Sequence, residues 1–99
     1  MSTSIVIKKI LVPIDGSDLS FKAASYALHL AKMENAELTA LNVVEDIKQG
    51  GSIGEYAEKN NLDLIVIGSK GRSKLKRLLT GGVANAVVNN AKIPVLVVR

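Results

Sequence analysis

Hydrophobic residues in this chain gather in short runs, and the spacing within the runs alternates between that of strands and that of helices. The first run, Ile5–Ile14 (IVIKKILVPI), is apolar and β-branched apart from a pair of lysines, which predicts a central parallel strand buried on both faces. Pro13 has no backbone N–H, so strand pairing is expected to fail near it. Between about Asp18 and Met33 apolar residues form one stripe at helical spacing, which predicts a helix with Ser17 as its N-cap.

The next part of the chain continues the alternation. Glu37–Val44 (ELTALNVV) predicts a second strand, and the polar, glycine-rich stretch Glu45–Gly54 predicts a connection. Ser52 and Glu55 have the spacing of a capping box, so a second helix is expected to start near Ile53 and to run to about residue 60.

The last runs complete the pattern. Asp63–Ile67 predicts a third strand, Val83–Asn90 a helix and Ile93–Val98 a final strand, with Pro94 placing the start of that strand at an edge or outside the ladder. Strands that alternate with helices favour a parallel sheet with right-handed crossovers, so the fold class predicted is α/β. The length of 99 residues predicts a single domain over residues 1–99.

Composition narrows the classes of protein. The chain has no cysteine, which excludes disulfides, thiolate metal sites and cysteine nucleophiles. No apolar run approaches the ~20 residues of a membrane-spanning helix, and the N-terminus has no signal-peptide pattern, so a soluble intracellular protein is expected.

Positive charge is concentrated in one segment. The net charge is +4, and the segment from Lys70 to Arg77 carries five Lys and Arg residues. Such a cluster attracts phosphate, nucleic acid or acidic partners, or forms a solvated surface. Nucleic-acid binding is disfavoured, because no aromatic residues that stack on bases alternate with the charges.

Glycines flank this basic segment. The third strand runs into Gly68-Ser69-Lys70-Gly71, and Gly81-Gly82 precedes the last helix. Glycines allow backbone N–H groups to approach phosphate oxygens, and a helix N-terminus favours negative charge. Ligands of parallel sheets bind outside the carboxyl ends of the strands, so Pro13–Ser17, Val43–Asp46 and Gly68–Gly71 are expected to converge there.

These stretches resemble the universal stress protein family over nearly the whole chain. The similarity lies in ILVPIDGSDLS, AELTALNVVE and DLIVIGSKGRSKLKRLLTGGVANAVVNNAKIPVLVVR, and Gly68, Gly71 and Gly81 match the glycine spacing of the nucleotide-binding branch. The resemblance implies a Rossmann-like, adenine nucleotide alpha hydrolase-like three-layer sandwich, shortened to about four strands and three helices. It also implies a cytoplasmic stress-response sensor or switch that binds ATP or AMP, with Mg or Mn at the phosphates of ATP.

The resemblance also assigns roles to particular positions. Pro13 and Asp15 would border the adenine and the ribose, and Val43 would form an apolar wall for the base. The backbone that binds phosphate and ribose would come from Gly68, Gly71, Gly81 and Gly82, with Val83 beside them.

Two departures from the family pattern support an alternative. Gly82 stands where the motif has Ser or Thr, and EDIKQGG replaces a long helix and a strand. The alternative is a shortened domain that has lost nucleotide binding and acts through dimerisation or protein partners. With less cover, apolar positions such as Leu38, Ala40 and Val43 are expected to be partly exposed, which favours oligomerisation. The resemblance implies a homodimer or higher oligomer through the edge strand Val95–Val98.

Catalytic residues are not evident. No nucleophile with a base and an orienting group can be recognised, and His29 is expected to be an ordinary surface or boundary residue. The chain is therefore not predicted to be an enzyme, although slow ATP hydrolysis stays open.

Overall fold

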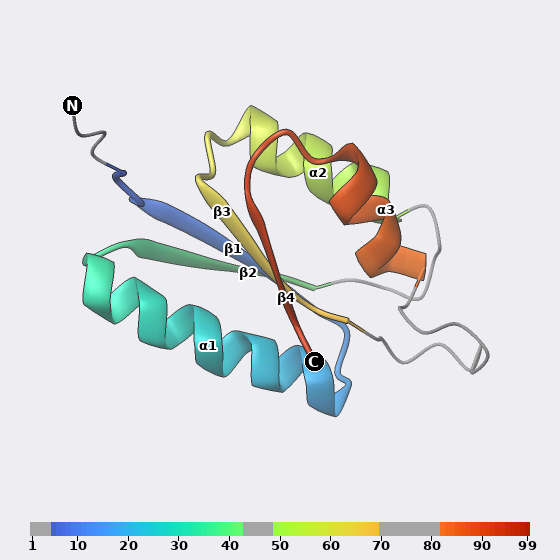
Figure 1. The fold of residues 1–99 in the computed structure, drawn as a ribbon, viewed down its shortest axis with the longest axis horizontal. Coiled ribbons are helices and arrows are strands. Elements are labelled where there is room, and N and C mark those ends of the chain that lie inside the picture. The colour runs from blue at the N-terminus through green and yellow to red at the C-terminus, as the bar shows by residue number, and fades with distance from the viewer. Residues whose placement is uncertain (1–4, 43–48, 70–81) are drawn as a thin grey trace.

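The computed structural model describes residues 5–42, 49–69 and 82–99, and strands alternate with helices through these ranges (Figure 1). In chain order the elements are β1 (Lys9–Ile14), α1 (Asp18–Glu34), β2 (Glu37–Asn42), α2 (Gln49–Lys59), β3 (Leu64–Gly68), α3 (Gly82–Asn90) and β4 (Val95–Val98). The predicted α/β class, with four strands and three helices in the described part, is confirmed.

The strands form one parallel sheet between two layers of helix. Its order is β2-β1-β3-β4, and each pair of neighbours is parallel. Helix α1 covers one face of the sheet, while α2 and α3 lie side by side on the other (Figure 1). Strand β2 lies on one side of β1, and β3 lies on the other side. The strand order therefore reverses between β1 and β3.

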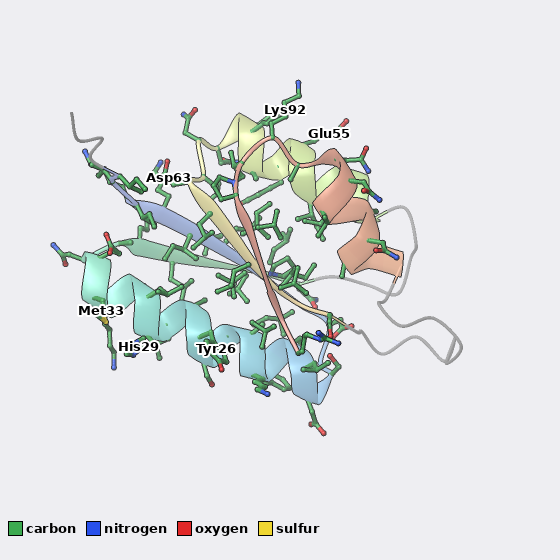
Figure 2. The ribbon with its side chains drawn as sticks, viewed as in Figure 1. Tyr26, His29, Met33, Glu55, Asp63 and Lys92 are labelled. Atoms are coloured by element: carbon green, nitrogen blue, oxygen red, sulfur yellow. The ribbon has the colours of Figure 1, made fainter. Side chains whose placement is uncertain are left out.

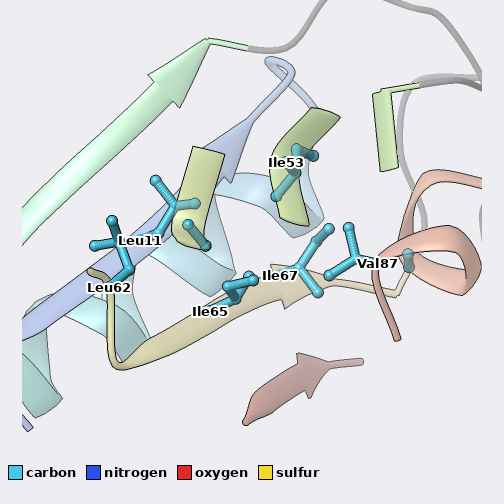
Figure 3. Close-up of a cluster of buried hydrophobic side chains, with 8 residues drawn as sticks. Leu11, Ile53, Leu62, Ile65, Ile67 and Val87 are labelled. Atoms are coloured by element: carbon cyan, nitrogen blue, oxygen red, sulfur yellow. The ribbon is translucent and has the colours of Figure 1, made fainter. Parts of the chain in front are cut away.

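Small and β-branched residues fill the two interfaces between sheet and helices. On the α1 side, Ala23, Ala27 and Ala31 are buried against the sheet, which lets the helix backbone approach closely. Under α2 and α3 the buried cluster is larger in side-chain volume and is shown in Figure 3; it comprises Leu11, Ile53, Ala57, Leu62, Ile65, Ile67, Ala84 and Val87.

Side-chain oxygens fix the ends of two elements. Ser17 is the N-cap of α1, as predicted, and its Oγ accepts a hydrogen bond from the N–H of Ser20 at 3.1 Å. Asn35 ends the helix in the left-handed region, with φ of 55°. At the amino edge of the sheet, Asp63 Oδ2 accepts the N–H groups of Lys8 and Lys9 at 2.9 and 3.0 Å, which joins the start of β3 to the start of β1.

Two predicted element starts are wrong by four residues, and the last strand begins at Val95 rather than Ile93. Strand β1 begins at Lys9 rather than Ile5; Ile5 and Val6 are exposed, whereas Ile7 packs against the cluster on the α1 side of the sheet. Helix α2 begins at Gln49, ahead of the predicted Ser52–Glu55 capping box. Residues three apart also share a face inside a helix, so this spacing does not distinguish a helix start from its interior.

The surface of α1 carries no pairing that suggests chemistry. His29 is exposed, as expected, and Figure 2 shows it on the outer side of the helix with Tyr26 and Met33. Among the described residues, no helix combines the length and the apolar character that a membrane crossing requires.

Candidate functional site

The carboxyl ends of the parallel strands bring several predicted site residues to one edge of the sheet. Pro13 lies near the end of β1, Asp15 follows that strand, and Gly68 ends β3, which is the neighbour of β1. Val43, Gly71, Gly81 and the basic segment 70–77 lie outside the described residues.

The chain leaves this edge in opposite directions from β1 and from β3. After β1 it enters α1 on one face, and after β3 it leads to α3 on the other (Figure 1). Adjacent strands whose connections diverge in this way mark the topological switch point, where open α/β sheets place their ligands.

Pro13 ends the pairing between these two strands before their ends. The Lys9 carbonyl accepts the Asp63 N–H at 2.8 Å, so Lys9 faces β3, and strand geometry turns Pro13, four residues later, to the same side. Pro13 has no N–H to donate, and the β1–β3 register stops at Leu11 opposite Ile65. On the other side, pairing with β2 continues to Ile14, so the expectation that pairing fails around Pro13 holds on the β3 side and is wrong on the β2 side.

The turn after β1 is held by its own hydrogen bonds. Asp15 Oδ1 accepts the Ser17 N–H at 2.9 Å, and the Ser20 hydroxyl donates to the Ser17 carbonyl at 2.8 Å. Gly16 has φ of 89°, in the left-handed region that glycine adopts without strain. Asp15 is half-buried, and the hydrogen bond to its Oδ1 orients the turn at this edge of the sheet.

Gly68 brings the two diverging segments into direct contact. A Cβ at this position would lie 3.0 Å from the Leu19 carbonyl oxygen, 3.1 Å from its carbonyl carbon and 3.2 Å from its Cβ. Only glycine fits this approach without displacing the first turn of α1. The sequence pattern did not reveal this contact, because Leu19 and Gly68 are brought together only by the fold.

Ser69 adds one more hydrogen bond between β3 and β4, directly after Gly68. Its N–H donates to the Val98 carbonyl at 2.7 Å, and the residue is buried. This backbone hydrogen bond extends the β3–β4 ladder to the rim of the sheet.

The start of α3 provides the second boundary of the site. The helix begins at Gly82, Val83 lies in its first turn, and that turn carries no acidic residue. By contrast, Asp18 lies in the first turn of α1. The N-terminus of α3 is therefore the more favourable of these two helix ends for an anion. No group of three or more His, Cys, Asp or Glu residues capable of holding a metal ion occurs within the described ranges.

Comparisons with known proteins agree with this architecture. A universal stress protein UspA from Lactobacillus plantarum has a solved structure with a TM-score of 0.84, and the match covers 97% of this chain and 100% of that chain at 23% identity. A universal stress protein solved in complex with cAMP has a TM-score of 0.74 at 25% identity, with 96% of this chain and 98% of that chain covered.

Sequence similarity reaches the same proteins. The universal stress protein MJ0531 of Methanocaldococcus jannaschii is 34% identical over 139 residues, which include 93% of this chain and 82% of the relative. YxiE of Bacillus subtilis, also a universal stress protein, is 30% identical over 148 residues, with 95% of this chain and 100% of the relative covered. The model of the universal stress protein family matches residues 7–54 and 48–99. The chain belongs to the universal stress protein family.

Proposed function

We propose that this chain is a single-domain, cytoplasmic stress-response module that binds an adenine nucleotide, ATP or AMP, and acts as a sensor or switch. The observation that carries the proposal is the end of β1–β3 pairing at the switch point, where Pro13 interrupts the ladder and Asp15 and Gly68 lie at the same edge. The relative solved with cAMP is consistent with an adenine nucleotide as the class of ligand.

The base and the ribose would lie beside the turn after β1. Pro13 presents a ring with no N–H, which suits the edge of an apolar base, and a carboxylate at Asp15 has the acceptor chemistry that ribose hydroxyls require. Val43 would supply the opposite apolar wall. Asp15 keeps its orientation through the Ser17 N–H, so the carboxylate is positioned before a ligand arrives.

The phosphates would lie toward α3. The first turn of that helix carries no carboxylate, and the N–H groups at a helix N-terminus favour an anion. Gly71, Gly81 and Gly82, with Val83, would contribute backbone to this part of the site. The contact of Gly68 with Leu19 gives that glycine a structural role, holding α1 and β3 together under the ligand. Mg or Mn would accompany ATP through the phosphate oxygens.

A second function is favoured by the glycine at position 82. Without a hydroxyl there, a charge-assisted hydrogen bond to phosphate is lost, which costs about 1.5–3 kcal/mol, or roughly ten- to hundredfold in affinity. The chain would then act through dimerisation or protein partners. The edge strand β4 supports this alternative, since Val95 and Val97 direct backbone groups outward and no charge interrupts the strand.

Calorimetric titration with ATP, AMP and cAMP, paired with thermal unfolding, distinguishes the two functions. A nucleotide at a hundredfold excess over Kd stabilises the folded state by about 2.7 kcal/mol. The variant Gly82→Ser is expected to bind ATP roughly ten- to hundredfold more tightly. Gly82→Ala is the matched control, since it changes the helix start equally but adds no hydroxyl.

Nucleotide binding and function through dimerisation or partners predict different results in these experiments. Binding by the natural sequence that weakens in Asp15→Asn, which removes a negative charge and keeps an acceptor for Ser17, supports the proposed site. No heat and no thermal shift at millimolar ATP, in both the natural sequence and Gly82→Ser, would leave only the function through dimerisation or partners.

A further inference from the structure

The outer edge of β2 carries an unpaired row of backbone groups. The Glu37 N–H donates to the Lys8 carbonyl at 2.8 Å, so Glu37 faces β1. Alternation along the strand turns Thr39 and Leu41 to the same side, and it turns the N–H and C=O groups of Leu38, Ala40 and Asn42 away from the sheet. Within the described residues, no strand lies beyond β2.

The family model matches this chain in two pieces, residues 7–54 and residues 48–99, which overlap after that strand in the sequence. The two family-model matches meet at residues 48–54, just past the end of β2 at Asn42. The alignment with MJ0531 spans 139 positions but contains only 93% of this 99-residue chain, so about 47 positions of it have no counterpart here. The junction between the two family-model matches therefore follows β2 in the sequence, and the length difference from MJ0531 is compatible with a shortening there.

Edge strands of monomers normally carry devices that prevent pairing, such as a lysine, a proline or a bulge. Strand β2 (ELTALN) has none of these, and its register with β1 is regular over six residues. Glu37 is its only charged residue. Ala40 is exposed on the face of the sheet that carries α1, two residues after Leu38, which packs on that face.

We propose that β2 pairs antiparallel with β2 of a second copy of this chain, about a two-fold axis at Ala40. In this register Ala40 lies opposite Ala40 of the other copy, and Leu38 lies opposite Asn42, so the three outward residues are all matched. A two-fold contact is self-complementary, so the same strand satisfies both sides. The open edge at the other end of the sheet, β4, has four residues against six for β2.

Charge is compatible with this pairing. The two Glu37 residues would lie at opposite ends of the paired strands, six residue steps apart, which is about 20 Å. This distance exceeds the Debye length of about 8 Å at physiological ionic strength, so their repulsion is screened. A pair of short strands buries less than the roughly 1,600 Å² of a standard interface, so the dimer is expected to be weak and dependent on concentration.

Amide hydrogen exchange measured by NMR at micromolar and at millimolar protein concentration tests the interface. The Ala40 N–H is expected to exchange more slowly at the higher concentration, with or without ATP. The Val97 N–H reports separately on the β4 edge. Equal exchange of Ala40 at both concentrations would overturn the proposal, even if Val97 became protected. Because ATP is not required, a failed nucleotide titration would leave this inference standing.

Variants that introduce a charge at Ala40 test the register of the proposed strand pair. Ala40→Lys and Ala40→Glu each place like charges opposite one another, so each alone is expected to weaken self-association at least about tenfold in sedimentation experiments. An equimolar mixture of the two is expected to recover association, and Ala40→Thr, an uncharged control, to retain it. A mixture that associates no better than either variant alone would exclude pairing centred on Ala40.

Discussion

Substituting Gly68 by alanine tests the contact that joins the two sides of the site. The added Cβ would lie 3.0–3.2 Å from three atoms of Leu19, of which two belong to the backbone. A backbone in the first turn of a helix cannot rotate away as a side chain can, and hydrogen bonds from Ser17 and Ser20 hold this turn in place. The helix must therefore shift as a whole, or β3 must withdraw from it.

The expected cost follows from two opposing effects. Inserting a methyl group into a tightly packed position costs about 1–3 kcal/mol, whereas replacing glycine in a strand returns about 0.5–1 kcal/mol of backbone entropy. The steric effect is the larger one, so Gly68→Ala is expected to be destabilising. At about 4–8 °C per kcal/mol for a domain of this size, the change in Tm is readily measured.

Urea denaturation followed by far-UV circular dichroism gives the free energy of unfolding, and the midpoint is expected to fall without a change in slope. Gly54→Ala is the matched control. Gly54 is buried within α2, but a Cβ there would meet its nearest atom, Ala91 Cα, at an ordinary 3.8 Å. This variant is expected to gain about 0.5–1 kcal/mol from helix propensity. A Gly68→Ala variant as stable as the natural sequence would refute the role assigned to Gly68.

Three further substitutions test how the ends of elements are held. Asp63→Ala is expected to cost about 1.5–3 kcal/mol in urea denaturation, because its carboxylate accepts two N–H groups at the start of β1, and Asp63→Asn should lose less; equal losses would show that an uncharged acceptor cannot replace the carboxylate. Ser17→Ala is expected to lose about 0.5–2 kcal/mol with the N-cap bond to Ser20, while Ser17→Asp keeps an acceptor; unchanged stability of the alanine variant would contradict the cap. Asn35→Ala is expected to cost about 1–2 kcal/mol because φ is positive there, and Asn35→Gly to cost nothing; thermal unfolding of both variants checks this.

The alternation of strand and helix could be predicted because each run has a spacing that only one kind of element buries well. The ends of the elements were harder to predict, because they depend on which residues the folded chain leaves exposed to solvent. Ile5 has the same character as the residues of β1, yet it lies beyond the start of the neighbouring strands and stays exposed. The start of α2 was misplaced because the spacing of Ser52 and Glu55 also fits a helix interior.

The candidate site was predicted less completely than the fold. Sequence placed Pro13, Asp15 and Gly68 at strand ends, and parallel strands must bring those ends to one edge. The direction in which Pro13 interrupts the ladder depends on which neighbour its missing N–H would face, and that requires the strand order. The contact between Gly68 and Leu19 depends on how closely α1 approaches the sheet, which no local pattern encodes.

The contact between Gly68 and Leu19 distinguishes a glycine needed for packing from one that bears on nucleotide binding. Gly68 is required by packing whether or not a nucleotide binds, so its presence does not distinguish a nucleotide-binding module from one that acts only through partners. Gly82 is informative in the opposite sense, because a hydroxyl at the start of α3 would strengthen phosphate binding, and its lack weakens that binding. The comparison of Gly82→Ser with Gly82→Ala in a nucleotide titration therefore bears on function directly, whereas the stability of Gly68→Ala bears only on the scaffold that positions the site.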